Sequence, residues 1–192
     1  MANQQILQKV VLATQKQDSL IAPEKVVQAL LSVEKTAKKQ KINYSFEQLV
    51  GTWRLRFITG TKKTRKKAGI VLGAGKYLPK FLKIAIAYQQ EENNRGRVAN
   101  CVDLKLLQLT LTGPVKFLAP QSILAFDFTK MELKLLGITL YNGYIRSGKD
   151  KEASFYDESI KKQAFFSYFY ITDQAIAARG RGGGLALWSR VV

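Results

Sequence analysis

Histidine is absent from the 192-residue sequence, and cysteine occurs once, as Cys101. Histidine is the commonest general base and a frequent zinc ligand, and a thiolate is the other common soft ligand. The composition therefore argues against histidine-based metal centres and against the Ser-His or Cys-His pairs of hydrolases. A single cysteine also excludes a disulfide within the chain and fits a reducing compartment. We expect Cys101 to be a small buried residue on a strand.

Acidic residues are scarce too, since 14 Asp and Glu stand against 31 Lys and Arg, which gives a net charge of +17. This excess predicts a polyanionic partner: nucleic acid, anionic lipid headgroups or an acidic protein surface. The carboxylates show no paired spacing typical of acid–base catalysis, so we expect no enzymatic activity, no cofactor and no metal site. No window reaches the roughly 18 apolar residues of a membrane span, and the amino terminus lacks a secretory apolar core, which predicts a soluble or peripheral protein.

The first part of the chain, residues 1–44, is predicted to be a helical arm. Apolar residues recur at helical spacing in residues 3–17, and a second helix is expected to begin at Pro23, a favoured first residue. The segment Ser45–Gln48 has the spacing of a capping box and predicts one further short turn. The apolar stripes of the two helices are Ile6 with Val10 and Val26 with Leu30. Since such stripes mark interfaces, we expect them to pack on the following domain, cap one of its ends or bind a partner.

From Gly51 onward the sequence changes to short runs of alternating apolar and polar residues, which predict strands. Trp53, Leu55 and Phe57 are expected to share one apolar face. A strand break is expected at Gly113-Pro114 and a loop at Arg146–Lys151. About nine or ten short strands at this spacing are typical of an antiparallel sandwich or barrel.

The end of the chain is expected to close the sheet. Phe165–Ile171 and the apolar run from Ala175 predict a hairpin, and the glycines at 182–184 allow a sharp bend into a last strand over 185–191. The first strand begins with Gly51-Thr52-Trp53, which is similar to the Gly-x-Trp signature of lipocalin-type barrels. In that family an arginine from the last strand packs across the tryptophan, a cation–π contact for which Arg179 and Arg190 are both candidates here.

The predicted fold class is therefore α+β, mainly β: an antiparallel lipocalin-like β-barrel over residues 45–192, preceded by two or three N-terminal helices. The expected closure residues are Gly51, Trp53, Arg179 and Arg190. A barrel of eight or more strands can hold an apolar ligand in its mouth. The candidate ligand-binding side chains are Trp53, Phe57, Tyr88, Phe126 and Tyr168.

Three motifs in order resemble the plastid-lipid-associated protein (fibrillin) family of plastids and cyanobacteria. They are Gly51–Leu55, Gly96–Leu104 and Phe169–Asp173 followed by Ala178–Gly180, within a region of about three quarters of the chain. The resemblance implies binding of an apolar small molecule (an isoprenoid such as a quinone or carotenoid, or a lipid) by sequestration and delivery. It also implies peripheral association with the cytoplasmic side of the thylakoid membrane or with lipid bodies in a cyanobacterium, or a place in the plastid stroma.

A dense basic run marks a second candidate site. Its cations are Lys62, Lys63, Arg65, Lys66 and Lys67. Such a run can simply be a solvated loop. We favour contact with an anionic membrane or an acidic protein, because five neighbouring cations repel one another unless a counter-charge is supplied.

A different function is left open by these residues. The protein could be a scaffold or assembly protein that docks its basic face onto an acidic photosynthetic or pigment-protein complex, with a barrel that is simply filled. A lumen large enough for an isoprenoid favours the binder, and a packed lumen favours the scaffold. Nucleic acid is not the favoured partner, because the Arg-Gly pattern at 179–182 occurs once and is flanked by strand-forming residues.

Overall fold

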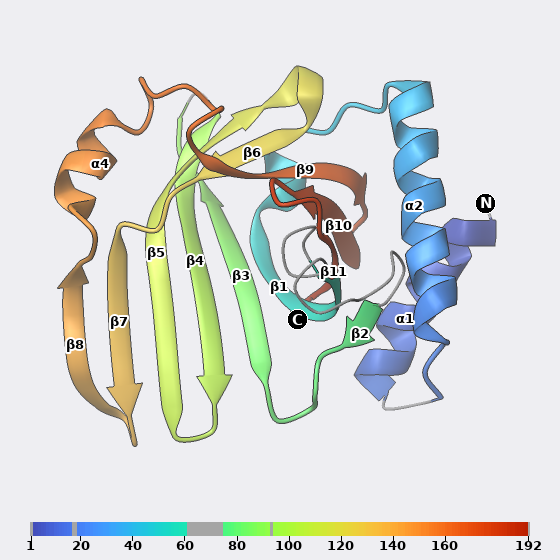
Figure 1. Ribbon diagram of the computed structural model, residues 1–192, viewed down its shortest axis with the longest axis horizontal. Coiled ribbons are helices and arrows are strands. Elements are labelled where there is room, and N and C mark those ends of the chain that lie inside the picture. Colours follow the sequence, from blue (N-terminus) through green and yellow to red (C-terminus); the bar gives the residue numbers. More distant parts are fainter. Residues whose placement is uncertain (1, 17–18, 61–74, 93, 192) are drawn as a thin grey trace.

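The computed structural model describes residues 2–16, 19–60, 75–92 and 94–191 (Figure 1). The helices are α1 (Ala2–Lys16), α2 (Pro23–Gln40) and α4 (Gly148–Ser154), with the 3-10 turns η1 (Glu47–Leu49) and η2 (Ala119–Gln121). The strands are β1 (Gly51–Thr59), β2 (Gly75–Tyr77), β3 (Lys83–Gln90), β4 (Arg95–Leu104), β5 (Leu107–Leu118), β6 (Ile123–Phe126), β7 (Lys130–Leu135), β8 (Ile138–Tyr144), β9 (Ala164–Ile171), β10 (Ala175–Gly180) and β11 (Leu185–Arg190). The two N-terminal helices and the short turn before β1 lie where the sequence predicts them.

Eight strands close a barrel of antiparallel neighbours in the order β1, β3, β4, β5, β6, β9, β10, β11 and back to β1. In the closing pair, β1 with β11, Trp53 lies opposite Arg190. The predicted fold class, an antiparallel barrel preceded by helices and closed by its first and last strands, is therefore confirmed. Outside the ring, β2 pairs with β1, and β7 and β8 extend the sheet from β5.

A bulge in β1 decides which of its side chains point into the barrel. The register to β11 shifts between Leu55 and Phe57, so strict alternation ends there. Trp53 belongs to the cluster of the barrel interior, whereas Phe57 is buried with the helices on the outside. The expected common face of Trp53, Leu55 and Phe57 is therefore wrong. Phe57, expected among the ligand-binding side chains of the lumen, lies outside it.

Helices α1 and α2 cover the outside of β1, β9, β10 and β11 (Figure 1). In their apolar stripes, Val10, Val26 and Leu30 are fully buried, and Ile6 is partly buried. They belong to the same core cluster as strand residues such as Phe169 and Leu187. This arrangement confirms the expectation that the stripes pack on the barrel rather than face water.

A partly buried ion pair joins α2 to the barrel. Glu34 of α2 accepts hydrogen bonds from Nε and Nη2 of Arg179 on β10 and from Nζ of Lys38. Burial alone acts to raise the pKa of Glu34, but the hydrogen bonds from Arg179 and Lys38 outweigh it and hold the pKa below its ordinary value. Arg179 therefore binds the helix, and the contact with Trp53 is made by Arg190.

Two expectations about the path of the chain are wrong. β5 runs without a break through Gly113-Pro114, because its partner on one side changes there from β7 to β6 while β4 pairs along the other side. Glycine is needed at this switch, since a Cβ on Gly113 would lie 1.9 Å from the carbonyl oxygen of Asp127. The expected loop Arg146–Lys151 instead runs into α4, where Glu152 forms an ion pair with Arg97 of β4.

Candidate functional site

The closed end of the barrel is built around Trp53. Its indole is fully buried, and Nε1–H donates a hydrogen bond of 2.7 Å to the carbonyl oxygen of Leu49. The guanidinium carbon of Arg190 lies 4.0 Å from the ring centroid, a cation–π contact between the first and last strands. Gly51 has a φ of 121°, and a Cβ there would lie 2.5 Å from Nη1 of Arg190. Glycine, tryptophan and arginine together seal this end.

Aromatic side chains fill the middle of the lumen. The hydroxyl groups of Tyr88 and Tyr168 are 2.8 Å apart and form a hydrogen bond, and both side chains are buried. Burial raises the pKa of each phenol, so both stay protonated at neutral pH. Phe46 and Phe117 are stacked with their ring centroids 5.9 Å apart in the same cluster. Tyr88 and Tyr168, both expected ligand-binding residues, therefore lie in a packed part of the barrel.

Beyond this packed part the barrel is open on one side. β1 leaves β3 after Arg54 and pairs with β2, and the first half of β5 pairs with β7 instead of a barrel strand. Because paired residues on neighbouring strands share a face, the other apolar residues in the row of Ile86, where Asn100 is the polar member, and those in the next row toward the open end continue the wall of the lumen. They are Ile84, Val102, Leu109, Leu111, Met131 and Leu133, all partly exposed, and we call them the open apolar face.

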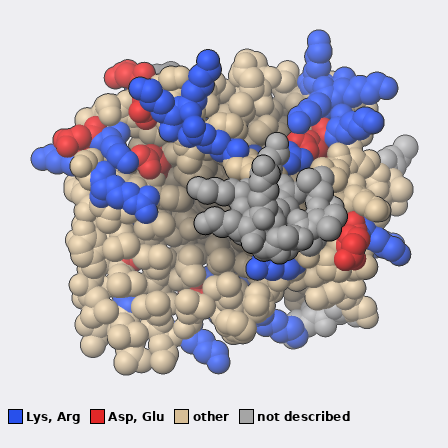
Figure 2. Space-filling model, viewed as in Figure 1, with Lys and Arg blue, Asp and Glu red and all other residues tan. Residues whose placement is uncertain are grey.

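Aromatic rings line the interior next to the open apolar face. The ring of Phe126 lies between those of Phe128 and Phe166, with centroid distances of 5.3 and 5.1 Å, and Phe166 meets Trp188 at 5.5 Å. Phe128 and Phe166 are partly exposed, whereas Phe126 and Trp188 are buried. In Figure 2 the lower left of the molecule, over β3, β4, β5, β7 and β8, carries few charged side chains. These surfaces fit an apolar ligand.

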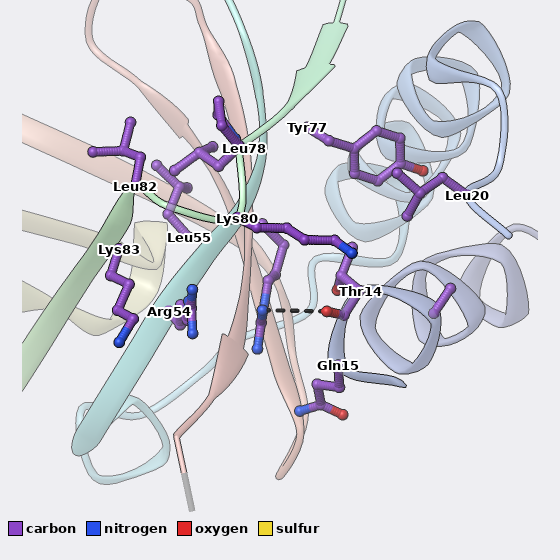
Figure 3. A pocket seen from close by; sticks show the side chains of 13 residues that line it. Thr14, Gln15, Leu20, Arg54, Leu55, Tyr77, Leu78, Lys80, Leu82 and Lys83 are labelled. Carbon is purple, nitrogen blue, oxygen red and sulfur yellow. Dashed lines mark hydrogen bonds between the residues drawn. The ribbon is translucent and has the colours of Figure 1, made fainter. Parts of the chain in front are cut away.

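A cleft of about 530 Å³ lies between β1, the connection from β2 to β3 and the end of α1 (Figure 3). Its apolar lining includes Leu20, Leu55, Tyr77, Leu78 and Leu82, and its cations are Arg54, Arg56, Lys80 and Lys83. The described lining residues include no carboxylate. Because Leu55 also packs against the interior cluster, the cleft adjoins the wall of the barrel.

The surroundings of Arg56 show that the cleft makes it less favourable for this side chain to be charged. Its Nε donates a hydrogen bond of 2.8 Å to Oγ of Ser189, and its Nη1 donates one of 3.5 Å to the carbonyl oxygen of Thr14. Burial lowers the pKa of Arg56, and repulsion from Arg54 adds to the effect. The guanidinium still stays charged at neutral pH, so an anion bound in the cleft would offset both penalties.

The sequence prediction missed the open apolar face, although its signal is present. Apolar and polar residues alternate over Leu107–Leu111 and Met131–Leu135. Such alternation predicts one apolar face for each strand but gives no information on whether another element covers it. Cys101, expected to be buried, is partly exposed on the opposite face of β4, because it pairs with Ala85 between the rows that line the lumen.

The predicted partner surface of Lys62, Lys63, Arg65, Lys66 and Lys67 lies outside the described residues. In the described part of the chain, no group of three or more acidic, cysteine or histidine side chains could hold a metal ion. No helix within the described ranges has both the length and the apolar character needed to cross a membrane.

Comparison with known proteins adds little to this geometry. No protein-family model matches the sequence, and no curated protein is significantly similar to it. Among solved structures, the chain is similar to fatty-acid-binding protein 1 of Echinococcus granulosus. The sequence identity is 10% and the TM-score 0.35, over 77% of this chain and 100% of that one. At those values the likeness carries no argument about ligand or activity, and the barrel is defined by its own strand pairing.

Proposed function

We propose that this protein binds apolar small molecules without catalysing a reaction on them, and that it associates peripherally with membranes. The open apolar face supports the proposal best, because it continues the lumen wall and stays partly exposed. It adjoins an aromatic surface that includes Phe128 and Phe166. Ligand sites of this kind combine extensive apolar walls with a few polar groups that fix orientation.

The mechanism is sequestration and delivery. An apolar tail would lie along Leu109, Leu111 and Met131, where burial of its surface supplies the binding energy. A polar or anionic head would pass through the split between β1 and β3 into the cleft beside Arg54 and Lys83, which lie on the outer face of the sheet. No bond is made or broken in this scheme, so the cations serve to orient the ligand and to offset its charge.

Within this class we propose an isoprenoid such as a quinone or carotenoid, or a lipid, as the ligand. We also propose membership of the fibrillin family and a place at the thylakoid membrane or lipid bodies, which the ordered motifs of the sequence support. The cleft favours ligands with an anionic or carbonyl head over a pure hydrocarbon, because the guanidinium of Arg54 and the ammonium of Lys83 can donate charge-assisted hydrogen bonds to such a head.

The tail site is tested by titrating the full chain with a fluorescent long-chain fatty acid. Leu109→Glu places a carboxylate on the open apolar face and should weaken binding at least tenfold. Gln108→Glu is the matched control, since it adds the same charge at the preceding residue, which lies on the other face of β5. Its partner on β7 is Lys134. It should leave the affinity within about twofold. Equal losses in the two variants, or no binding by the wild type, would remove the proposal.

The head site is tested with the same fatty acid and its methyl ester. Arg54→Gln combined with Lys83→Gln should weaken binding of the acid by about tenfold and leave the ester almost unchanged. Equal weakening of both would mean that the cleft does not hold the head. The native ligand is identified by purifying the protein from its host and analysing an organic extract by mass spectrometry, where an isoprenoid or lipid is expected at close to one molecule per chain.

The packed middle of the lumen favours a second candidate function. If Tyr88, Tyr168 and Phe117 only fill the barrel, the basic surface could dock onto an acidic photosynthetic or pigment-protein complex. On that account, the titrations above show no ligand. The protein would instead bind isolated thylakoid complexes in a manner that weakens as salt increases.

A further inference from the structure

Large apolar side chains are exposed at the tips of two neighbouring hairpins. In the turn between β4 and β5, Leu106 is 60% exposed, and around the turn between β7 and β8, Leu136 and Ile138 are each 67% exposed. The backbone N–H of Leu136 donates a hydrogen bond of 2.8 Å to the carbonyl oxygen of Leu106, so the two tips lie side by side. Two flanking residues, Leu104 and Leu135, are exposed as well.

An exposed phenylalanine lies next to these two hairpins, just before the neighbouring strand β3. Phe81 is 60% exposed and precedes β3, whose first residue, Lys83, pairs with Asp103 next to the β4–β5 turn. We call the set the hairpin edge; it consists of Phe81, Leu104, Leu106, Leu135, Leu136 and Ile138. In Figure 1 the turns that carry these residues lie together along the lower border of the molecule.

Isolated exposed leucines are common on soluble proteins, but a contiguous group of this kind marks an interface. Its chemistry fits the boundary of a bilayer. Leucine and phenylalanine side chains enter the headgroup and acyl region, while neighbouring lysines meet lipid phosphates. Lys83 and Lys105 are exposed beside the hairpin edge, and the whole chain carries a net charge of +17.

We propose that the hairpin edge inserts into the interfacial region of an anionic lipid bilayer. The proposal rests on the peripheral membrane association described above and assigns it to residues that the sequence did not suggest. The proposal also defines how the protein is oriented on the bilayer: the hairpin tips point into the lipid, and α1 and α2 lie away from it.

The same edge forms the start of an apolar path to the ligand site. Leu104, Leu107 and Leu135 form one row across β4, β5 and β7. The next row on the same face is Val102, Leu109 and Leu133, and the third contains Leu111 and Met131 beside the polar Asn100 of β4. A molecule that leaves the bilayer at the hairpin edge would therefore stay on apolar side chains until it reaches the open half of the barrel.

The test is cosedimentation of the full chain with vesicles of phosphatidylcholine containing about one third phosphatidylglycerol. Leu136→Asp with Ile138→Asp should lower the partition coefficient at least tenfold. The matched control is Leu12→Asp with Leu31→Asp, which places the same charge at exposed leucines of the two helices. The control should lose no more than about threefold, because it changes only the net charge. Equal losses in the two double variants, or none, would overturn the proposal.

Direct insertion has its own readout. Leu136→Trp adds an indole at the hairpin tip, and brominated phosphatidylcholine in the vesicles should quench its emission, whereas Leu31→Trp should not be quenched. Quenching at neither position would contradict insertion even if vesicles are bound. Pairing of the edge with a second copy through β8 is a separate outcome, and sedimentation velocity without lipid detects it. A dimer that the Leu136→Asp/Ile138→Asp variant dissociates, with vesicle binding unchanged, overturns the membrane assignment.

Ligand binding is read separately. The Leu136→Asp/Ile138→Asp variant should bind the fluorescent fatty acid in solution as the wild type does, because the substitutions leave the open apolar face intact. If this variant shows normal ligand binding and unchanged vesicle binding, only the hairpin-edge proposal is contradicted. Absent ligand binding by the wild type, with vesicle binding that depends on the hairpin edge, would sink the ligand proposal and leave the membrane surface standing.

Discussion

Two sides of the same barrel differ in whether another element covers their apolar residues. On the side of β9, β10, β11 and β1, the outward apolar residues are buried under α1 and α2, as Leu187 and Phe57 show. On the side of β4, β5, β7 and β8, the apolar face continues the lumen wall but stays partly exposed, and the hairpin edge is mostly exposed. The strands differ as well: Ala175–Ala178 of β10 are all apolar and all buried, whereas apolar and polar residues alternate in β7 and none is buried. A cover on the outer face, together with the packed lumen, makes the first side stable core and leaves the second side available.

The two sides also contribute to different free energies: the covered side to folding, and the open side to binding. Burial on the helix-covered side contributes to folding, because each large apolar side chain there is removed from water. The open side forgoes that contribution, and its apolar surface remains available for a ligand or a bilayer. Substitutions on the covered side should therefore change stability, and substitutions on the open side should change binding.

The largest expected effect comes from the closed end of the barrel. Trp53→Ala removes a fully buried indole, its hydrogen bond to Leu49 and its contact with Arg190. We expect the free energy of unfolding to fall by about 3–5 kcal/mol in urea titrations. Leu140→Ala on the exposed strand β8 should change it by less than about 0.5 kcal/mol. Similar losses for both variants would erase the contrast between the two sides.

Adjacent leucines on α2 compare cover and exposure within one helix. Leu30 is fully buried against the barrel, whereas Leu31 is 38% exposed. Leu30→Ala should lower the free energy of unfolding by about 2–4 kcal/mol, and Leu31→Ala by well under 1 kcal/mol. Equal small effects would show that packing of the helices contributes little to the stability of the barrel, and would contradict the contrast between the two sides.

The ion pair between Glu34 and Arg179 predicts a dependence on pH. Because the pKa of Glu34 is lowered in the folded protein, its contribution is present above the unfolded pKa and is lost as the pH falls through the folded pKa. Glu34→Gln should cost about 1–3 kcal/mol at pH 7, and the difference from the wild type should shrink below about pH 4. A difference that stays constant from pH 7 to pH 3 would contradict this role.

The smallest expected effect on stability belongs to the hairpin edge. Leu136→Ser with Ile138→Ser removes exposed apolar surface that makes little contact within the chain, so the free energy of unfolding should change by less than about 0.5 kcal/mol. Vesicle binding by the same variant should nevertheless fall. A clear loss of stability in urea would mean that these side chains belong to the core.

Local patterns in the sequence predicted much of the fold. The helical stripes and Pro23 were recognisable because each depends on residues at short, characteristic spacing. The pairing of the first and last strands was expected from the resemblance of Gly51–Trp53 to the Gly-x-Trp signature, which left both Arg179 and Arg190 as candidates for the contact with Trp53. The bulge before Phe57 and the continuous path of β5 through Gly113-Pro114 were missed. Both depend on which strand lies opposite, which short-range patterns do not encode.

The candidate site was predictable only in part. Aromatic residues suggested a lumen, but Tyr88 and Tyr168 turned out to satisfy each other through a hydrogen bond in a packed interior. The partly exposed site residues are aliphatic, and their exposure follows from the pairing of β5 with β7 outside the barrel ring. The cleft beside Arg54 depends on the split between β1 and β3, which is likewise a property of long-range pairing.

The central claim is that the open side is the working surface of the protein, and hydrogen–deuterium exchange tests it most directly. The full chain is compared alone and with anionic vesicles that contain a long-chain fatty acid. The account predicts slower exchange in peptides covering residues 102–111 and 131–141, with α1 and α2 unchanged. Protection confined to α1 and α2, or no change in either hairpin, would contradict it.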